Sequence, residues 1–283
     1  MAINSLSQPT FAAQLRAIWL IAKKDWKVFW RYPLNAASQI FQPIIWITPV
    51  YFMGLAFSTN GKALGFAQFS GTSDYMSYIL VGTALSNFIL TVFWGMGYAL
   101  KEDMDAGVLE SNWLTPVSRI YILIGRTLTS MFITMITSAV MLIISSLLFG
   151  FHPTGDLTAA LLVALPMLIG LYGFGFAFAA IVLLMRDANT LVDVSSFIVQ
   201  GLSGSNFPVR SLPTWLIPLA LAMPLTYGLD AVRGFLLKTT TIFPIPIEIT
   251  LVIVFMFVML WFGTWIFNRT ERKVRRMGTL GQH

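Results

Sequence analysis

The sequence has no cysteine and only two histidines, His152 and His283, among its 283 residues. Without cysteine the chain can form no disulfide, no thiolate metal site and no cysteine nucleophile. Two histidines so far apart are too few for a typical metal cluster. These absences argue against thiol-dependent and metal-dependent chemistry in this chain.

Charged residues are also scarce, at 11%, whereas hydrophobic residues make up 57% and the mean hydropathy is +0.76. An ordinary soluble domain carries about 25% charged residues. Apolar runs recur along the whole chain, and about 20 such residues cross the hydrocarbon core of a bilayer as a helix. We therefore expect an all-α integral membrane protein with one transmembrane domain over residues 36–283, preceded by an N-terminal tail and helix over residues 1–35.

The sequence also lacks a phosphate-binding loop of the form G-x-x-x-x-G-K-[ST], since Gly61-Lys62 has no glycine at the required distance before it. Phosphoryl transfer is not expected here without that loop. The formal charge of +6 comes from basic residues near the two ends, where they would face anionic lipid. We expect membrane lipid as a partner, no nucleic acid, and no cleaved signal peptide, because no charged region precedes the first apolar stretch.

The segment Phe11–Arg31 has helical spacing with two opposed faces. Its aromatic and aliphatic residues fall on one arc, and its basic residues fall on the other: Arg16, Lys23, Lys24, Lys27 and Arg31. This pattern is typical of a helix that lies in the membrane interface, with tryptophans at headgroup depth. The alternative is an amphipathic helix that packs on a soluble domain.

Six membrane-spanning helices are predicted from the apolar runs. They cover Ala36–Phe57, Met76–Leu100, Ile120–Phe149, Leu157–Met185, Thr190–Ser205 and Ile247–Phe267. The fifth is short and polar, so it should face other helices or a cavity. Its polar residues, with one just beyond it, are candidates for a transport pathway: Asp193, Ser196, Gln200 and Asn206.

The segment Trp215–Tyr227 is apolar but too short to cross as a helix, and Pro218 and Pro224 interrupt it. We interpret it as re-entrant or interfacial. With six spans, most lysines and arginines fall on the side that carries both termini, which predicts that both termini are cytoplasmic. A seventh span would place the basic C-terminal tail outside.

The connection between the second and third spans is the most acidic stretch of the chain, with Glu102, Asp103, Asp105 and Glu110. Apolar residues such as Leu109 and Trp113 lie between and after the acids, a combination that suits docking to a partner surface. A solvated acidic loop, a carboxylate metal site and carboxylate acid–base catalysis are the alternatives.

Two further sets of residues have a structural and a functional interpretation. Asp230 and Arg233 lie three apart, so on a helix they could form an ion pair at the outer membrane face or contact a substrate. A row of small residues in the fourth span would let another helix approach closely, which favours packing over transport: Gly170, Gly173, Ala177 and Ala180.

Several short motifs follow one another in order along the chain. They are Arg31-Tyr32-Pro33, Gly107-Val-Leu-Glu110, Thr115-Pro116-Val-Ser-Arg119, Phe207-Pro208, Leu212-Pro213-x-Trp215 and Pro224-Leu-Thr-Tyr-x-x-Asp-Ala-x-Arg233. In this order and at these depths the sequence resembles the permease subunits of ABC type-two exporters. One departure is Val108, which stands where the family often has threonine after glycine.

The resemblance implies roles for two segments. The segment Glu102–Pro116 would be the coupling helix against an ATPase subunit, with contacts from Glu102, Asp103, Asp105, Gly107, Leu109, Glu110, Trp113 and Pro116. The segment Phe207–Arg233 would form short re-entrant helices on the outer side, between the fifth and sixth spans. Its residues of interest are Pro213, Trp215, Pro224, Tyr227, Asp230 and Arg233.

The resemblance further implies a non-catalytic transmembrane subunit of an ATP-driven exporter in the bacterial inner membrane. It would pair with a second permease copy, identical or a close paralogue, and with a separate ATPase that binds ATP and magnesium. It would move a drug-like, lipid-linked or polymeric amphipathic molecule out of the cytoplasm by alternating access. A stand-alone secondary transporter or channel is the alternative, and it would be expected to show charged relays or repeated interrupted spans.

Overall fold

The computed structural model describes residues 10–56, 58, 63–99, 107, 115, 117–151, 153–185 and 188–277. Over these residues the chain is helical and contains no strand. The elements are α1 (Phe11–Arg31), α2 (Pro33–Ala56), α3 (Leu64–Ser70), α4 (Tyr75–Val92), the π-helix η1 (Phe93–Tyr98), α7 (Arg119–Phe149), α8 (Leu157–Val182), α9 (Ala188–Leu202), the 3-10 turn η2 (Val209–Ser211), α10 (Ile217–Leu221), α11 (Pro224–Leu237) and α12 (Ile245–Met277).

Five of these helices are long and apolar enough to cross a membrane: α2, α4 continued by η1, α7, α8 and α12. They confirm five of the six predicted spans. The remaining one corresponds to α9, which has 15 residues and is therefore about 22 Å long. That length falls short of the roughly 30 Å of a hydrocarbon core, so a sixth span stays a prediction.

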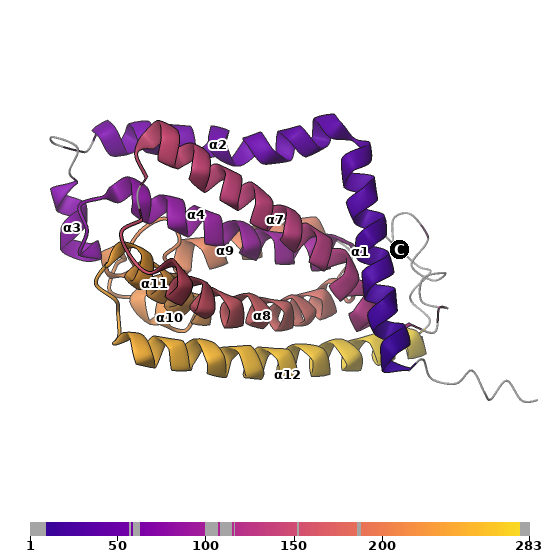
Figure 1. Ribbon diagram of the computed structural model, residues 1–283. Helices are drawn as coiled ribbons and strands as arrows, with labels where there is room; N and C mark the ends of the chain where they lie inside the picture. Colours follow the sequence, from indigo (N-terminus) through magenta and orange to yellow (C-terminus); the bar gives the residue numbers. More distant parts are fainter. Residues whose placement is uncertain are drawn as a thin grey trace, which may run out of the picture.

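Helix α1 lies across one end of the bundle formed by the long helices, while α3, α10 and α11 gather at the opposite end (Figure 1). We call these the α1 end and the α11 end. The last turns of α12 also lie at the α1 end (Figure 1), where Glu271 forms an ion pair of 3.4 Å with Arg119 at the start of α7. The described ends of the chain therefore lie on the same side of the bundle.

Several helices begin or end at capping residues. The Asp74 carboxylate accepts a hydrogen bond from the Ser77 amide at 3.0 Å, and the Asp156 carboxylate accepts from Thr158 and Ala159 at 2.9 and 3.1 Å. Such caps satisfy amides that have no partner inside the helix. Gly150 ends α7 at a positive φ of 71°, a conformation that glycine adopts without steric cost.

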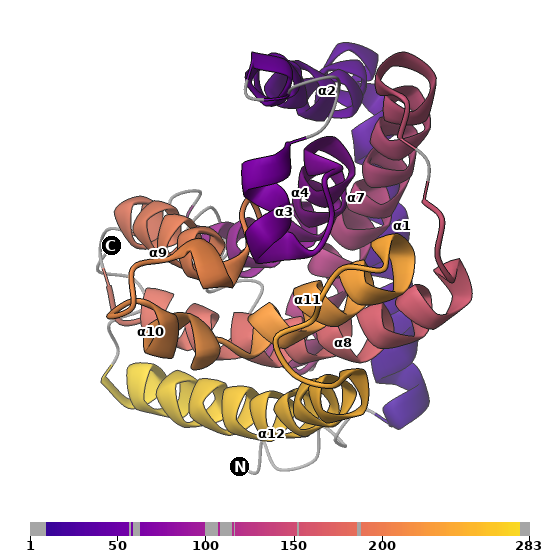
Figure 2. The ribbon, with the colours of Figure 1, turned by 90° about the vertical axis from the view of Figure 1, so that its left-hand side faces the viewer.

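Helices α8 and α12 lie along one another (Figures 1 and 2). A Cβ atom at Gly173 would lie 2.3 Å from the carbonyl carbon of Met259, and one at Gly263 would lie 1.8 Å from the Gly173 oxygen. A Cβ atom at Gly170 would likewise meet the Phe255 ring at 3.0 Å. The packing interpretation of these glycines is confirmed, and the helix that approaches them is α12.

Helix α1 has the bounds that the sequence predicts, and it packs on α7. The Thr129 hydroxyl donates to the Ala22 carbonyl at 2.9 Å, and Gly125 leaves room for Ile21 close to the α7 backbone. The Trp26 and Phe132 rings meet edge to face with centroids 5.4 Å apart. These contacts with α7 therefore fix the position of α1.

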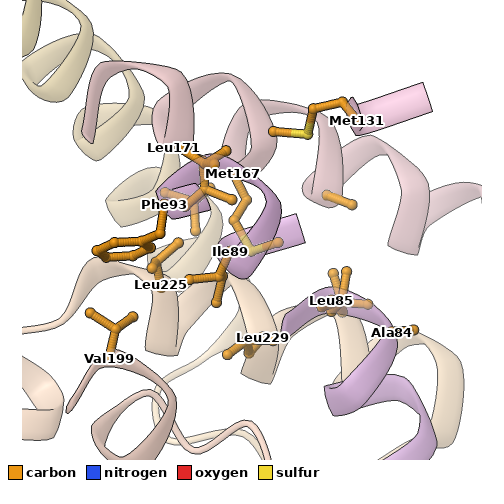
Figure 3. Packing of buried hydrophobic residues seen from close by; sticks show 14 of the residues in the cluster. Ala84, Leu85, Ile89, Phe93, Met131, Met167, Leu171, Val199, Leu225 and Leu229 are labelled. Carbon is orange, nitrogen blue, oxygen red and sulfur yellow. The ribbon is translucent and has the colours of Figure 1, made fainter. Parts of the chain in front are cut away.

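The core lies around α4, whose side chains meet residues from α7, α8, α9 and α11 (Figure 3). Ile89, Met167, Leu171 and Leu229 are completely enclosed. Helix α4 is central because its neighbours cover it on several sides, whereas α2 is exposed along most of its length.

Candidate functional site

A cavity of about 690 Å³ lies between α2, α4, α3 and the segment that follows α9. Its volume falls in the range of small-molecule sites. Five of its aromatic rings come from different parts of the chain: Trp46, Phe66, Phe69, Tyr75 and Phe207. Uncharged polar groups complete the lining: Gln42, Thr83, Asn87, Gln200, Asn206 and Ser211. Among the described residues no charged side chain lines it.

The structure brings two of the four predicted pathway residues to this cavity, Gln200 and Asn206. The other two lie elsewhere on α9. Ser196 is buried, and its hydroxyl donates to the Asp193 carbonyl at 2.8 Å. The Asp193 side chain is exposed and does not line the cavity.

Sequence reasoning missed the polar face of α4. Thr83, Asn87 and Thr91 follow one another at intervals of four residues, which places them on one face of a helix, and the first two line the cavity. This spacing within an apolar span is a signal that could have revealed them. The Asn87 Nδ2 atom is enclosed and has no hydrogen-bond partner among the described residues, so the wall of the cavity contains an unsatisfied donor.

The end of α9 and the turn after it form one wall of the cavity, and Arg233 fixes this wall by hydrogen bonds. Its Nε donates to the Tyr78 carbonyl at 3.1 Å and its Nη1 to the Gly204 carbonyl at 2.7 Å. Its Nη2 donates to the Ser205 carbonyl, and the guanidinium lies 3.7 Å from the centroid of the Tyr78 ring. The side chain is 1% exposed. One arginine therefore ties α11 to α4 and to the turn after α9.

Gly82 leaves the space in which Arg233 and the Ser205 carbonyl meet. A Cβ atom there would lie 1.8 Å from the Ser205 oxygen and 1.9 Å from Arg233 Nη2. Gly204 has a φ of 72°, which directs the carbonyl groups of the turn toward the guanidinium. Two glycines and one arginine thus fix the segment from which Asn206 reaches the cavity.

The structure gives Asp230 and Arg233 separate partners. An Asp230 carboxylate oxygen accepts from the Ile242 amide at 2.6 Å, whereas the hydrogen bonds of Arg233 given above go to the carbonyl groups of Tyr78, Gly204 and Ser205. The ion pairs found among the described residues, Lys24–Asp25 and Arg119–Glu271, do not include this pair. Asp230 therefore joins α11 to the segment before α12, and Arg233 joins α11 to α4 and to the turn after α9.

The predicted re-entrant segment contains a break between two short helices, α10 and α11. Pro224 opens α11, and the Tyr227 hydroxyl donates to the Leu221 carbonyl at the end of α10. Trp215 is 70% exposed and Pro213 is also exposed, before α10 begins. The helix break predicted from the prolines is confirmed, while the position of this hairpin in a membrane stays a prediction.

Two more cavities continue from the first toward the α1 end. One of about 400 Å³ shares Gln42, Pro43, Asn87 and Leu90 with the first. It also shares Gln39, Thr91, Trp94, Ile133 and Thr134 with a cavity of about 680 Å³ beside α1. The cavity beside α1 is lined by Arg126 and by Lys24 and Asp25, which form an ion pair of 3.1 Å. The three cavities form a row along α2.

Most of the predicted coupling segment lies outside the described residues: Glu102, Asp103, Asp105, Leu109, Glu110, Trp113 and Pro116. Gly107 is described and has a φ of 65°. On either side of the segment, Ala99 accepts a hydrogen bond of 3.0 Å from Arg126 and Arg119 pairs with Glu271. The described residues that flank the segment therefore lie at the α1 end.

Comparisons with known proteins agree with this architecture. The family model described as ABC-2 type transporter matches residues 16–237. The chain is also similar to the probable doxorubicin resistance ABC transporter permease protein DrrC of Mycobacterium tuberculosis, in strains CDC 1551 / Oshkosh and ATCC 25618 / H37Rv. Identity with each is 27% over 196 residues, which cover 67% of this chain and 67% of the relative. Because the family model covers more than half of the chain and its long apolar helices can cross a membrane, the chain belongs to the ABC-2 type transporter family of multi-pass membrane permeases.

Proposed function

We propose that this chain is the membrane subunit of an exporter that moves an uncharged or weakly charged aromatic amphiphile and is driven by a separate ATPase. The cavity between α2, α4 and the end of α9 carries this proposal. Aromatic rings bury large apolar area, and a few placed polar groups fix the orientation of a ligand. A wall without charge favours a drug-like molecule over a polyanionic polymer.

The similarity to a protein named for doxorubicin resistance supports the same substrate class. Asn87, Gln200 and Asn206 offer amide donors and acceptors to the carbonyl and hydroxyl groups of such a ligand. The row of cavities along α2 gives the substrate a route from the α1 end to the α11 end.

The proposal includes orientation and topology. Both termini are cytoplasmic in a bacterial inner membrane, so the α1 end is the inner end and α1 lies in the interface. Helix α9 and the turn that follows it complete a sixth crossing, and α10 with α11 forms a re-entrant hairpin on the outer side. The excess of lysine and arginine at the α1 end supports this orientation.

Energy enters through the segment Glu102–Pro116, which docks on the ATPase. ATP binding draws two ATPase subunits together and shifts two permease copies between inward-open and outward-open arrangements. The second copy packs against exposed apolar residues of α2, such as Phe41, Ile45 and Phe52.

The test is doxorubicin uptake into inside-out membrane vesicles from cells that express this chain together with a candidate ABC ATPase subunit. We expect accumulation that requires ATP and that disappears when either subunit is omitted. Uptake by the permease alone without nucleotide would instead establish a secondary transporter and overturn the proposal.

A further inference from the structure

Two acidic side chains lie together at the α11 end, outside the cavity described above. Asp230 belongs to α11, and Glu248 lies in the first turn of α12. Their exposed fractions are 9% and 0%. An ionised carboxylate is rarely buried to this extent without a cation or several donors, because its desolvation is costly.

Neighbouring backbone amides hold the two carboxyl groups side by side. The Ile242 amide donates to Asp230 Oδ2 at 2.6 Å, and the Phe243 amide donates to Glu248 Oε1 at 3.0 Å. These two amides belong to consecutive residues, so they place the carboxyl groups next to each other, and the two groups interact electrostatically. One oxygen of Glu248, Oε1, is satisfied by this hydrogen bond at the start of α12. The other oxygen, Oε2, is enclosed and has no donor among the described residues.

The positive charges nearby do not neutralise this pair directly. Arg233 uses its guanidinium on the carbonyl groups of Tyr78, Gly204 and Ser205. Arg210 donates to the Thr241 carbonyl at 2.7 Å, and both arginines act on Asp230 through their electric fields. The Tyr227 hydroxyl, a titratable group near Glu248, donates to Leu221, and Tyr78 is a titratable group near Asp230.

Two ionised carboxylates are both acceptors, so neither can satisfy the other. Two carboxyl groups in contact retain a proton between them, because like charges at that distance cannot both ionise. We infer that Asp230 and Glu248 form a buried proton-binding site in which one shared proton links α11 to the start of α12. The same burial raises the pKa of the Asp230 carboxyl.

A shared proton makes the contact between α11 and α12 sensitive to pH. The folded protein holds a proton that the unfolded chain has lost above the ordinary carboxyl pKa values. Stability from this contact is therefore present at low pH and is lost as the pH rises and the pair becomes doubly charged.

Infrared spectroscopy of the full-length protein in lipid nanodiscs tests the site directly. At neutral pH we expect the carbonyl stretch of a protonated carboxyl group, and we expect both Glu248→Gln and Asp230→Asn to abolish it, since each leaves a single ionised carboxylate facing an amide donor. The control Asp156→Asn, at an exposed helix cap, should leave the band unchanged.

Two results would overturn the inference: no such band in the wild-type protein, or a band that survives in either variant. Thermal unfolding supplies a second readout. Between about pH 6 and about pH 9 the melting temperature of the wild type should fall more than that of Glu248→Gln, whose amide donates to Asp230 at every pH. Parallel pH profiles would contradict the shared proton even if both variants fold normally.

Discussion

Helices α2 and α4 with η1 are both 24 residues long and both apolar enough to cross a membrane. In its most apolar stretch the α4 segment is 67% buried, whereas α2 is 12% buried. The difference lies in their surroundings, because α4 is covered by its neighbours and α2 has one side toward the cavities and the other side open. Length and hydropathy identify a membrane-spanning helix. They do not distinguish a helix in the centre of the bundle from one whose exposed side would contact lipid or a second subunit.

The two helices also differ in how they are tied to the rest of the molecule. Helix α4 is joined to α11 and to the end of α9 through Arg233 and Tyr78. Helix α2 carries two internal prolines, Pro43 and Pro49, which remove backbone hydrogen bonds and let a helix bend. We therefore expect α4 to be the fixed wall of the cavity and α2 to be the wall that can move.

The largest expected effect is that of Arg233→Ala, which removes the tie between α4 and its neighbours. It leaves buried carbonyl groups without donors and creates a cavity, so we expect a loss of about 4 kcal/mol or more in stability. The measurement is thermal unfolding with size-exclusion chromatography in mild detergent. A variant that stays monodisperse with an unchanged melting temperature would show that Arg233 does not hold the wall.

A matched pair of isoleucines compares the two helices directly. Ile89 of α4 is 0% exposed and Ile45 of α2 is 69% exposed. Ile89→Ala should cost about 2–5 kcal/mol because it opens a void in the core, whereas Ile45→Ala should leave the melting temperature of the isolated subunit almost unchanged. Equal losses in the two variants would mean that α2 is as enclosed as α4.

Two glycines within the α4 segment give the next smaller effect. Gly82→Ala places a methyl group where Ser205 and Arg233 Nη2 lie, and overpacking of this kind costs about 1–3 kcal/mol. At Gly95 the nearest atom to a new Cβ would be 3.5 Å away, so Gly95→Ala is the control and should be tolerated. The difference between their unfolding temperatures is the measurement, and no difference would refute the close approach at Gly82.

The smallest effect concerns α1, which precedes α2 and positions its start. Thr129→Val keeps the side-chain shape but removes the hydrogen bond to Ala22. We expect a loss of about 1 kcal/mol, measured by thermal unfolding. A Ser130→Ala variant, which changes a hydroxyl for which no such bond is described, serves as the control. If Thr129→Val is no less stable than the control, α1 is held by apolar packing alone.

The sequence predicted the helices well because their signals are local. The two arcs of α1 gave its bounds, and the lengths of the apolar runs gave five spans. The interior was harder to foresee, because Arg233 acts on carbonyl groups 28 and 155 positions away. The sequence offered Asp230 as its partner since the two lie one helical turn apart, but Asp230 turns toward Ile242 and Glu248.

The cavity shows the same limit. The polarity of the fifth predicted span pointed to Gln200, and Asn206 lies just beyond it. The aromatic walls come from α2, α3, α4 and the segment after α9, which only tertiary packing brings together. The four-residue spacing of Thr83, Asn87 and Thr91 was present in the sequence, and it becomes meaningful once α9 is known to lie beside that face.

The central claim, that the exported molecule binds in this cavity, can be tested most directly by cysteine labelling, because the chain has no cysteine of its own. Gln200→Cys places a thiol in the cavity, and Phe197→Cys places one outside it on α9, at a residue that is 74% exposed. The measurement is the rate of maleimide labelling of each variant, with and without doxorubicin. The account predicts that doxorubicin slows labelling at position 200 and leaves position 197 unaffected. Unchanged labelling at position 200 under saturating doxorubicin would contradict it.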